Sequence, residues 1–238
     1  MKLRQYCSIL CLLSINLPIN TDTITLDLKK LNQEFFSAIY RANIWGDSNS
    51  RSGPGSNFKR TEKIRAWLPE IFKKYGTKRL VDCACGDFFW SKEVDLSSIM
   101  YIGVDIVSDV IVENIKRYAN DKRIFLHLDI TADELPAADT VICRDCLPHL
   151  CFADIFAALK NFKKTGAQYL IISTYPDRTI NHDLQGAHLV NLLRYRPLNF
   201  QYPPFNFPAP LAIINEANDE GGIEDKSLAI WAFKDLPI

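Results

Sequence analysis

The sequence has no excess of charge of either sign. Its 238 residues carry 28 Lys and Arg against 28 Asp and Glu, with 4 His. Proteins that bind the phosphate backbone of nucleic acids usually show a basic excess or a clustered basic face, so a nucleic-acid partner is not favoured. The shares of 47% hydrophobic and 24% charged residues exclude a disordered or collagen-like chain.

The sequence also lacks an apolar run long enough to cross a membrane. A transmembrane helix needs about 20 apolar residues, whereas the run at Tyr6–Leu17 is shorter and follows the basic residues Lys2 and Arg4. Residues 1–20 resemble a secretory signal or membrane anchor, and the alternative is a helix or strand packed on the domain. Membrane contact is expected through this segment if at all.

The seven cysteines are too sparse for a disulfide scaffold in a chain of this length. Five of them cluster near the ends of expected buried strands: Cys83, Cys85, Cys143, Cys146 and Cys151. Free cysteine behaves as a small buried hydrophobe. We therefore expect core thiols in a reducing, cytoplasmic compartment, with secretion or membrane association as the alternative. Cys143-x-x-Cys146 has no second well-spaced Cys/His pair, so no metal is expected.

The body of the chain alternates between short β-rich runs and helical segments. The expected strands are Arg79–Cys83, Met100–Val104, Arg123–Leu128, Thr140–Cys143 and Tyr169–Ser173. The expected helices between them are Phe88–Asp95, Val107–Ala119 and Phe152–Lys163. Apolar strands that alternate with helices predict an α/β fold with a doubly wound, mostly parallel sheet. The runs Leu211–Ala217 and Ser227–Phe233 predict a C-terminal antiparallel hairpin.

The residues before the first expected strand predict a helical cap on the sheet. A helical pattern at Leu28–Tyr40 leads into a stretch of turn-forming residues at 48–57, and a second helix is expected at Glu62–Tyr75 with Thr61 as its cap. The expected organisation is therefore a signal-like or anchor-like segment at 1–20, a helical cap with a Ser/Gly loop at 21–78, and the sheet domain at 79–238.

The first strand runs directly into Asp82-Cys83-Ala84-Cys85-Gly86-Asp87. In open α/β sheets, ligands bind at the carboxyl ends of the strands, and Ala84 and Gly86 are small enough to let a ligand approach the backbone there. The G-x-G-x-x-G fingerprint of dinucleotide-binding proteins is missing, since the turn reads A-C-G-D-F-F. That absence disfavours a nicotinamide-dependent oxidoreductase.

Two further acidic residues close the next two strands. Asp105 lies nineteen residues after Gly86, a distance that suits a carboxylate accepting both hydroxyls of a ribose. Asp129 ends the following strand, where it could accept a hydrogen bond from an adenine amino group. Each acid alone is typical of an ordinary strand end, but three at matched strand ends favour a nucleoside site.

This series of acids, with the reversed hairpin at the end, resembles the class I S-adenosylmethionine-dependent methyltransferases over about residues 79–238. A group of uncharacterised bacterial-type members is similar in four segments: the variant Asp-x-x-Cys-Gly-Asp at 82–87, the loop at 50–56, Cys143-Arg144-Asp145 and Asp225-Lys226-Ser227. The resemblance implies a Rossmann-like sheet and S-adenosylmethionine as the cofactor. The roles that it implies are the methionine end for Asp82 and the turn with Ala84 and Gly86, the ribose for Asp105 with Ile106, and the adenine for Asp129 with Ile130. Phe88 stands where the family's glycine motif has its last glycine.

The fourth strand leads into Arg144-Asp145-Cys146-Leu147-Pro148-His149, the segment that flanks the transferred methyl group in similar enzymes. Methyl transfer needs positioning and a general base, and Asp145 and His149 are the candidates. His149 has an ordinary pKa that lets it accept a proton at neutral pH. Arg51 or Arg144 could pair with the carboxylate of the cofactor. The alternatives are structural roles for each of these residues.

The sequence says least about the molecule that accepts the methyl group. Residues 195–210 hold five of the twelve prolines and five aromatic residues, and an aromatic wall suits a sugar face or another planar acceptor. The expected function is therefore methyl transfer to a hydroxyl or amine of a small-molecule or glycan-like acceptor. The alternative is a catalytically silent Rossmann-like binding module.

Overall fold

The computed structural model describes residues 21–184, 195–218 and 222–238. Residues Gln33–Ile238 form one compact unit. Residues 1–20, the expected signal-like or anchor-like segment, lie outside the described residues. Within the described ranges, no helix combines the length and the apolar character needed to cross a membrane.

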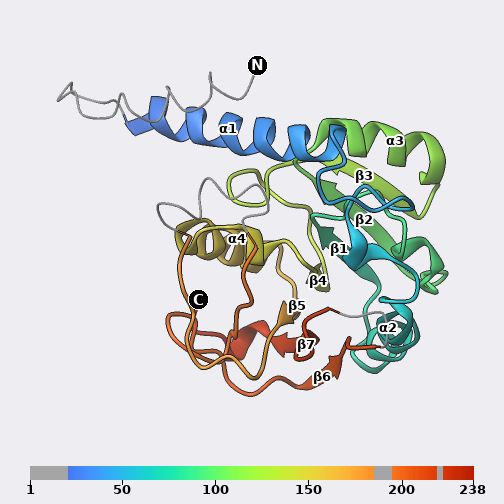
Figure 1. Cartoon of the computed structure of the whole chain (residues 1–238). Helices are drawn as coiled ribbons and strands as arrows, with labels where there is room; N and C mark the ends of the chain where they lie inside the picture. Colours follow the sequence, from blue (N-terminus) through green and yellow to red (C-terminus); the bar gives the residue numbers. More distant parts are fainter. Residues whose placement is uncertain (1–20, 185–194, 219–221) are drawn as a thin grey trace. The chain divides into compact units, whose positions relative to one another are not determined.

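The core of this unit is a seven-stranded sheet in the order β3-β2-β1-β4-β5-β7-β6 (Figure 1). Its strands are β1 (Arg79–Cys83), β2 (Met100–Asp105), β3 (Arg123–His127), β4 (Thr140–Cys143), β5 (Tyr169–Thr174), β6 (Ala212–Asn215) and β7 (Ser227–Ala232). The first five strands are parallel, whereas β7 runs antiparallel to both β5 and β6. This confirms the predicted α/β fold, with a mostly parallel sheet that ends in an antiparallel hairpin.

Apolar side chains leave the strands on both faces and build two hydrophobic cores. In β1, Val81 and Cys83 belong to one core, and Leu80 to the other, as the two-residue period of a strand requires. The helix α4 (Phe152–Lys164) packs in the first core, and α2 (Glu62–Lys74) and α3 (Ser108–Tyr118) pack in the second. Figure 1 shows α4 on one side of the sheet and α2 and α3 on the other. The sheet is doubly wound, and its strand ends remain free to carry a site.

The N-terminal helix and the cysteines follow the sequence-based expectation in outline. The helix α1 runs over Thr21–Arg41, longer than the pattern at 28–40 indicated, and Ile39 near its end is buried. The five described cysteines are free thiols, and Cys83, Cys85 and Cys143 are buried. Burial raises the pKa of each of these three thiols well above the ordinary value. They are therefore unreactive core residues.

Two local predictions are wrong. Residues 88–95 do not form a helix, because Phe88 has a left-handed backbone and a single 3₁₀ turn at Ser91–Glu93 is all that follows. The spacing that indicated a helix instead sends Phe88, Trp90 and Val94 into one core. Thr61 does occupy the cap position of α2, but its hydroxyl donates back to the Asn57 carbonyl oxygen at 2.9 Å, so the side chain does not cap the helix.

Candidate active site

The turn after β1 has a left-handed shape although two of its three positive-φ residues are not glycine. Ala84, Gly86 and Phe88 have φ angles of 63°, 57° and 56°, an alternation that glycine adopts most easily. The ring of Phe88 is fully buried and packs against Tyr101 at 4.9 Å between centroids, so it belongs to the core and does not lie over the strand ends. A Cβ at Gly86 would lie 2.3 Å from the hydroxyl of Ser52, and this position therefore requires glycine.

Asp82 lies at the same turn, inside the protein. It is 5% exposed and accepts a hydrogen bond of 2.6 Å from the hydroxyl of Tyr101. Burial raises the pKa of Asp82 to about 7, although the hydrogen bond from Tyr101 opposes the shift. This carboxyl therefore changes its charge close to neutral pH, and a cation placed beside it would favour the charged form.

Asp105 ends β2 and connects it to the turn after β1. One carboxylate oxygen accepts from the Gly86 backbone N–H at 3.0 Å, and the other from the Val107 backbone N–H at 2.9 Å. Burial raises the pKa of Asp105, and these two hydrogen bonds oppose the shift. The neighbouring Ile106 carbonyl oxygen lies 2.9 Å from a ring nitrogen of His127. Asp105 is thus oriented by the backbone on both sides.

Asp129 closes the loop after β3 in a similar way. Its Oδ1 accepts from the backbone N–H and the hydroxyl of Thr131, at 2.8 and 2.7 Å. Ile130 is buried, and its carbonyl oxygen accepts from the Asn161 side chain at 3.0 Å. The second carboxylate oxygen of Asp129 makes no hydrogen bond within the described parts of the chain. The structure therefore places three oriented acids at the carboxyl ends of β1, β2 and β3.

The Ser/Gly loop at 48–57 is fastened to the turn after β1 by Asp87. The carboxylate of Asp87 accepts from the hydroxyls of Ser50 and Ser52 at 3.0 and 3.1 Å and from the Arg51 backbone N–H at 2.9 Å. The Asp87 backbone N–H in turn donates to the hydroxyl of Ser52 at 2.9 Å. The guanidinium of Arg51 lies over the ring of Tyr40, 5.7 Å from its centroid, and is exposed.

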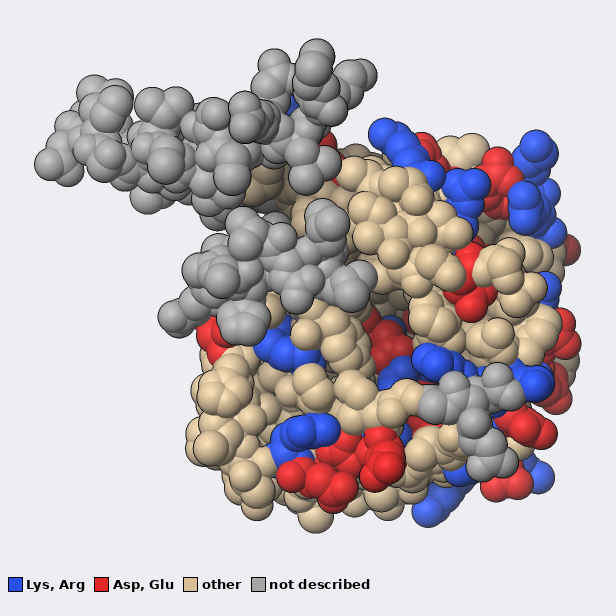
Figure 2. Space-filling model, in the orientation of Figure 1, with Lys and Arg blue, Asp and Glu red and all other residues tan. Residues whose placement is uncertain are grey.

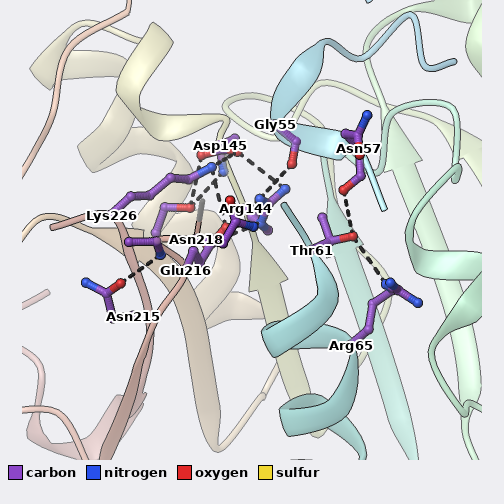
Figure 3. Close-up of polar contacts among 12 residues, drawn as sticks. Gly55, Asn57, Thr61, Arg65, Arg144, Asp145, Asn215, Glu216, Asn218 and Lys226 are labelled. Atoms are coloured by element: carbon purple, nitrogen blue, oxygen red, sulfur yellow. Dashed lines mark hydrogen bonds and ion pairs between the residues drawn. The ribbon is translucent and has the colours of Figure 1, made fainter. Parts of the chain in front are cut away.

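The other end of the loop is fastened by Arg144, which follows β4 (Figure 3). The guanidinium of Arg144 donates to the Gly55 carbonyl oxygen at 2.8 Å and to the carboxylate of Glu216 at 2.5 Å. The side chains of Arg144 and Glu216 are 4% and 3% exposed, so this is a buried ion pair. We call Arg144, Asp145, Glu216 and Lys226 the charge cluster.

Asp145 completes this cluster and is the less suitable of the two candidate bases. Lys226 contacts its carboxylate at 2.5 Å and Arg144 at 3.3 Å. Burial alone raises the pKa of Asp145, but these two cations outweigh burial and lower it to about 2. Asp145 therefore stays charged at neutral pH and holds a proton poorly. Its own backbone N–H donates to the hydroxyl of Ser173 at 2.9 Å, which fixes its left-handed conformation.

His149, the other candidate base, lies in the 3₁₀ turn Leu147–His149 between two aromatic rings. Its ring centroid is 5.9 Å from that of Trp45 and 5.1 Å from that of Tyr195. All three side chains are partly exposed. The imidazole is thus held by packing while part of its surface remains accessible.

Sequence reasoning missed four residues that hold the site together: Tyr101, Asp87, Glu216 and Lys226. Asp87 directly follows Gly86 and carried a signal, since an acid inside a small-residue turn is unusual. Glu216 follows the apolar run of β6 and is an acid that the fold buries, which strand periodicity alone could not indicate.

On the face shown in Figure 2, acidic and basic side chains are interspersed, and a recess near its centre holds both kinds.

No protein-family model and no curated protein matches the sequence, whereas solved structures do. The chain is similar to magnesium protoporphyrin IX methyltransferase (ChlM) from Synechocystis PCC 6803 with bound SAH, at 17% identity and a TM-score of 0.57, over 85% of this chain and 97% of that one. It is also similar to the N-methyltransferase NodS from Bradyrhizobium japonicum WM9 with bound SAH, at 13% identity and a TM-score of 0.56, over 84% and 99%.

A third similar structure is the glycopeptide N-methyltransferase MtfA in complex with S-adenosylmethionine, at 13% identity and a TM-score of 0.51, over 70% of this chain and 85% of that one. The chain has the fold of the class I methyltransferases. At these identities the likeness concerns the fold, and the site has to be argued from the residues of this chain.

The buried ion pair between Arg144 and Glu216 generates a prediction about stability. We expect Glu216→Gln to lower the free energy of unfolding by up to about 3–5 kcal/mol, because the buried guanidinium loses its closer countercharge and keeps only Asp145, which Lys226 also binds. Urea unfolding followed by circular dichroism measures this. The matched control is Glu224→Gln, since Glu224 is exposed and should change the free energy by less than about 0.5 kcal/mol. Equal effects of the two substitutions would contradict the buried pair.

The raised pKa of Asp82 generates a prediction about pH. In the unfolded chain this carboxyl loses its proton near its ordinary pKa of 3.8, whereas in the folded protein it keeps the proton to about pH 7. The folded state therefore binds more protons in this interval, and stability falls as the pH rises from about 4 to about 7. Urea unfolding at several pH values should show a smaller decline for Asp82→Asn than for the wild type. Parallel curves would contradict the assignment.

Proposed function

We propose that the protein transfers a methyl group from S-adenosylmethionine to a hydroxyl or amine of a small-molecule or glycan-like acceptor. The observation that carries the proposal is the row of three oriented acids, Asp82, Asp105 and Asp129, at the carboxyl ends of adjacent strands of a class I methyltransferase fold. Ligands of open α/β sheets bind at this edge.

The geometry of the acids fits the cofactor. Each carboxylate oxygen of Asp105 already accepts one backbone hydrogen bond and has a second lone pair, so the pair can accept the two ribose hydroxyls. Oδ2 of Asp129 is available for the adenine amino group, with Ile130 and Ile106 as apolar neighbours. Asp82 would lie near the ammonium group of the methionine end, with the backbone of Ala84 and Gly86 beside it.

Arg51 and Arg144 differ in their contacts, and this difference decides which of them can pair with the carboxylate of the cofactor. The donors of Arg144 are directed to Glu216, Asp145 and Gly55, which makes it a positioning residue for the loop. Arg51 projects from the same loop, and its guanidinium lies over the ring of Tyr40. Arg51 is therefore the better candidate for a charge-assisted pair with a carboxylate.

When bound, S-adenosylmethionine supplies an electrophilic methyl group on a positively charged sulfur. This chain has to hold the acceptor in line, exclude water and remove a proton from the nucleophile. His149 serves as the base, because an imidazole is the side chain that most readily exchanges a proton at neutral pH and part of this ring surface is accessible. Asp145 contributes its fixed negative charge, since Lys226 and Arg144 lower its pKa too far for proton transfer.

The alternative of a catalytically silent module is motivated by the altered glycine motif and the N-terminal segment, and a Phe88 ring that plugs the site would support it. The ring of Phe88 packs in the core with Tyr101, Tyr118 and Phe125 and is 0% exposed, so that obstacle is removed. The similar proteins carry names that include a porphyrin and a glycopeptide, and these names differ too much to narrow the acceptor.

Calorimetric titration with S-adenosylhomocysteine tests the proposal. We expect the wild type to bind and Asp105→Asn to lose about 10- to 100-fold in affinity, because a hydrogen bond to a charged group contributes about 1.5–3 kcal/mol. Asp121→Asn, at an exposed turn, is the matched control and should bind as the wild type does. The proposal fails if the folded wild type does not bind, or if Asp105→Asn binds with unchanged affinity.

A further inference from the structure

Four ring side chains from separate segments form a continuous row beside the charge cluster. Trp45 contacts His149, His149 contacts Tyr195, and Tyr195 contacts Tyr175 with centroids 6.3 Å apart. We call these four residues the aromatic row. Trp45, His149 and Tyr195 are partly exposed, so the row offers ring surface next to the candidate base.

Two buried polar atoms in this region have no hydrogen-bond partner among the described residues. The hydroxyl of Tyr175 is one, and its side chain is 0% exposed. Oδ1 of Asp225 is the other, and it forms an ion pair at 3.5 Å with the exposed Arg178. Buried groups without partners are rare and costly, and a bound ligand is one of the standard explanations.

Three carboxylates act on the Tyr195 side of the aromatic row. Burial raises the pKa of the Tyr195 phenol first, and the carboxylates of Asp145, Glu216 and Asp225 raise it further against the opposing charge of Arg144. Of these three acids, Asp145 and Glu216 are paired with Arg144 and Lys226, which leaves Asp225 as the acid that a bound cation can pair with.

Building on the proposed function, we infer that the acceptor is an amine, bound as an ammonium ion against the aromatic row with Asp225 as its buried carboxylate partner. Ring faces of Trp and Tyr attract cations, most strongly where water is excluded. The Asp225 carboxylate supplies the countercharge and accepts an N–H of the ammonium group.

The chemistry of deprotonation also favours an amine over a sugar hydroxyl. An alkylammonium ion has a pKa near 10.4, whereas an aliphatic hydroxyl holds its proton about as tightly as water, with a pKa near 15.7. At neutral pH an imidazole base can remove the proton of an alkylammonium ion but not that of an aliphatic hydroxyl. A phenol is acidic enough, but it would place an anion among three carboxylates.

The transfer is balanced as follows. The ammonium ion gives a proton to a ring nitrogen of His149, and its lone pair forms a nitrogen–carbon bond to the methyl group. The carbon–sulfur bond breaks with its electron pair remaining on sulfur, so the positive charge moves from the sulfonium to the methylated amine. Because the product is again a cation, the aromatic row stabilises the start and the end of the step.

The test compares two probes of nearly equal shape, phenethylamine and 2-phenylethanol, by calorimetric titration of the full chain with and without saturating S-adenosylhomocysteine. We expect the amine to bind at least about tenfold more tightly than the alcohol. Asp225→Asn should remove most of this preference, and Trp45→Leu should weaken the amine more than the alcohol. Asp235→Asn, an exposed acid, is the matched control.

Several outcomes would overturn the inference. Equal affinity for the two probes, or failure of both to bind, excludes an ammonium site at the row. An amine preference that survives both Asp225→Asn and Trp45→Leu places the site elsewhere. If the wild type prefers the amine but does not bind S-adenosylhomocysteine, the proposed methyltransferase function is rejected and the ammonium site is retained. Failure of the proposed function can therefore be distinguished from failure of the ammonium site.

Discussion

The buried ion pair between Arg144 and Glu216 is the constraint on which the rest of the site depends. A guanidinium that is 4% exposed cannot stay charged without a partner, and Glu216 supplies it from the C-terminal hairpin. The same guanidinium binds the Gly55 carbonyl oxygen, so the loop, β4 and the hairpin meet at one point. A Cβ at Gly55 would lie 2.9 Å from Asp145, which leaves glycine as the residue that permits this approach.

Asp87 fixes the opposite end of the loop and so links it to the turn after β1. The hydrogen bonds from Ser50, Arg51 and Ser52 hold this turn in its left-handed shape. Ala84 and Phe88 adopt this shape without being glycine, because the loop holds the backbone from outside and the Phe88 ring packs in the core. The loop thus connects the turn after β1 with the segment after β4.

The sequence was sufficient for the sheet because its information is local. Short apolar runs predicted all seven strands to within a few residues, and the parallel arrangement brought Asp82, Asp105 and Asp129 to one edge. The helix expected at 88–95 failed because tertiary packing of Phe88 and Trp90 outweighed local periodicity. The charge cluster could not be predicted from the sequence for a related reason. Arg144 and Glu216 are 72 residues apart, and no local pattern marks two distant charges as a buried pair.

We propose that the three strand-end acids, with the loop held over them, form the binding site of S-adenosylmethionine. A crystal structure of the protein grown with S-adenosylhomocysteine is the decisive measurement. We expect ribose hydroxyls within hydrogen-bond distance of the Asp105 carboxylate and the adenine beside Asp129 and Ile130, with the contacts of Asp87 to the loop retained. A ligand bound elsewhere, or one whose ribose makes no contact with Asp105, would reject this binding site.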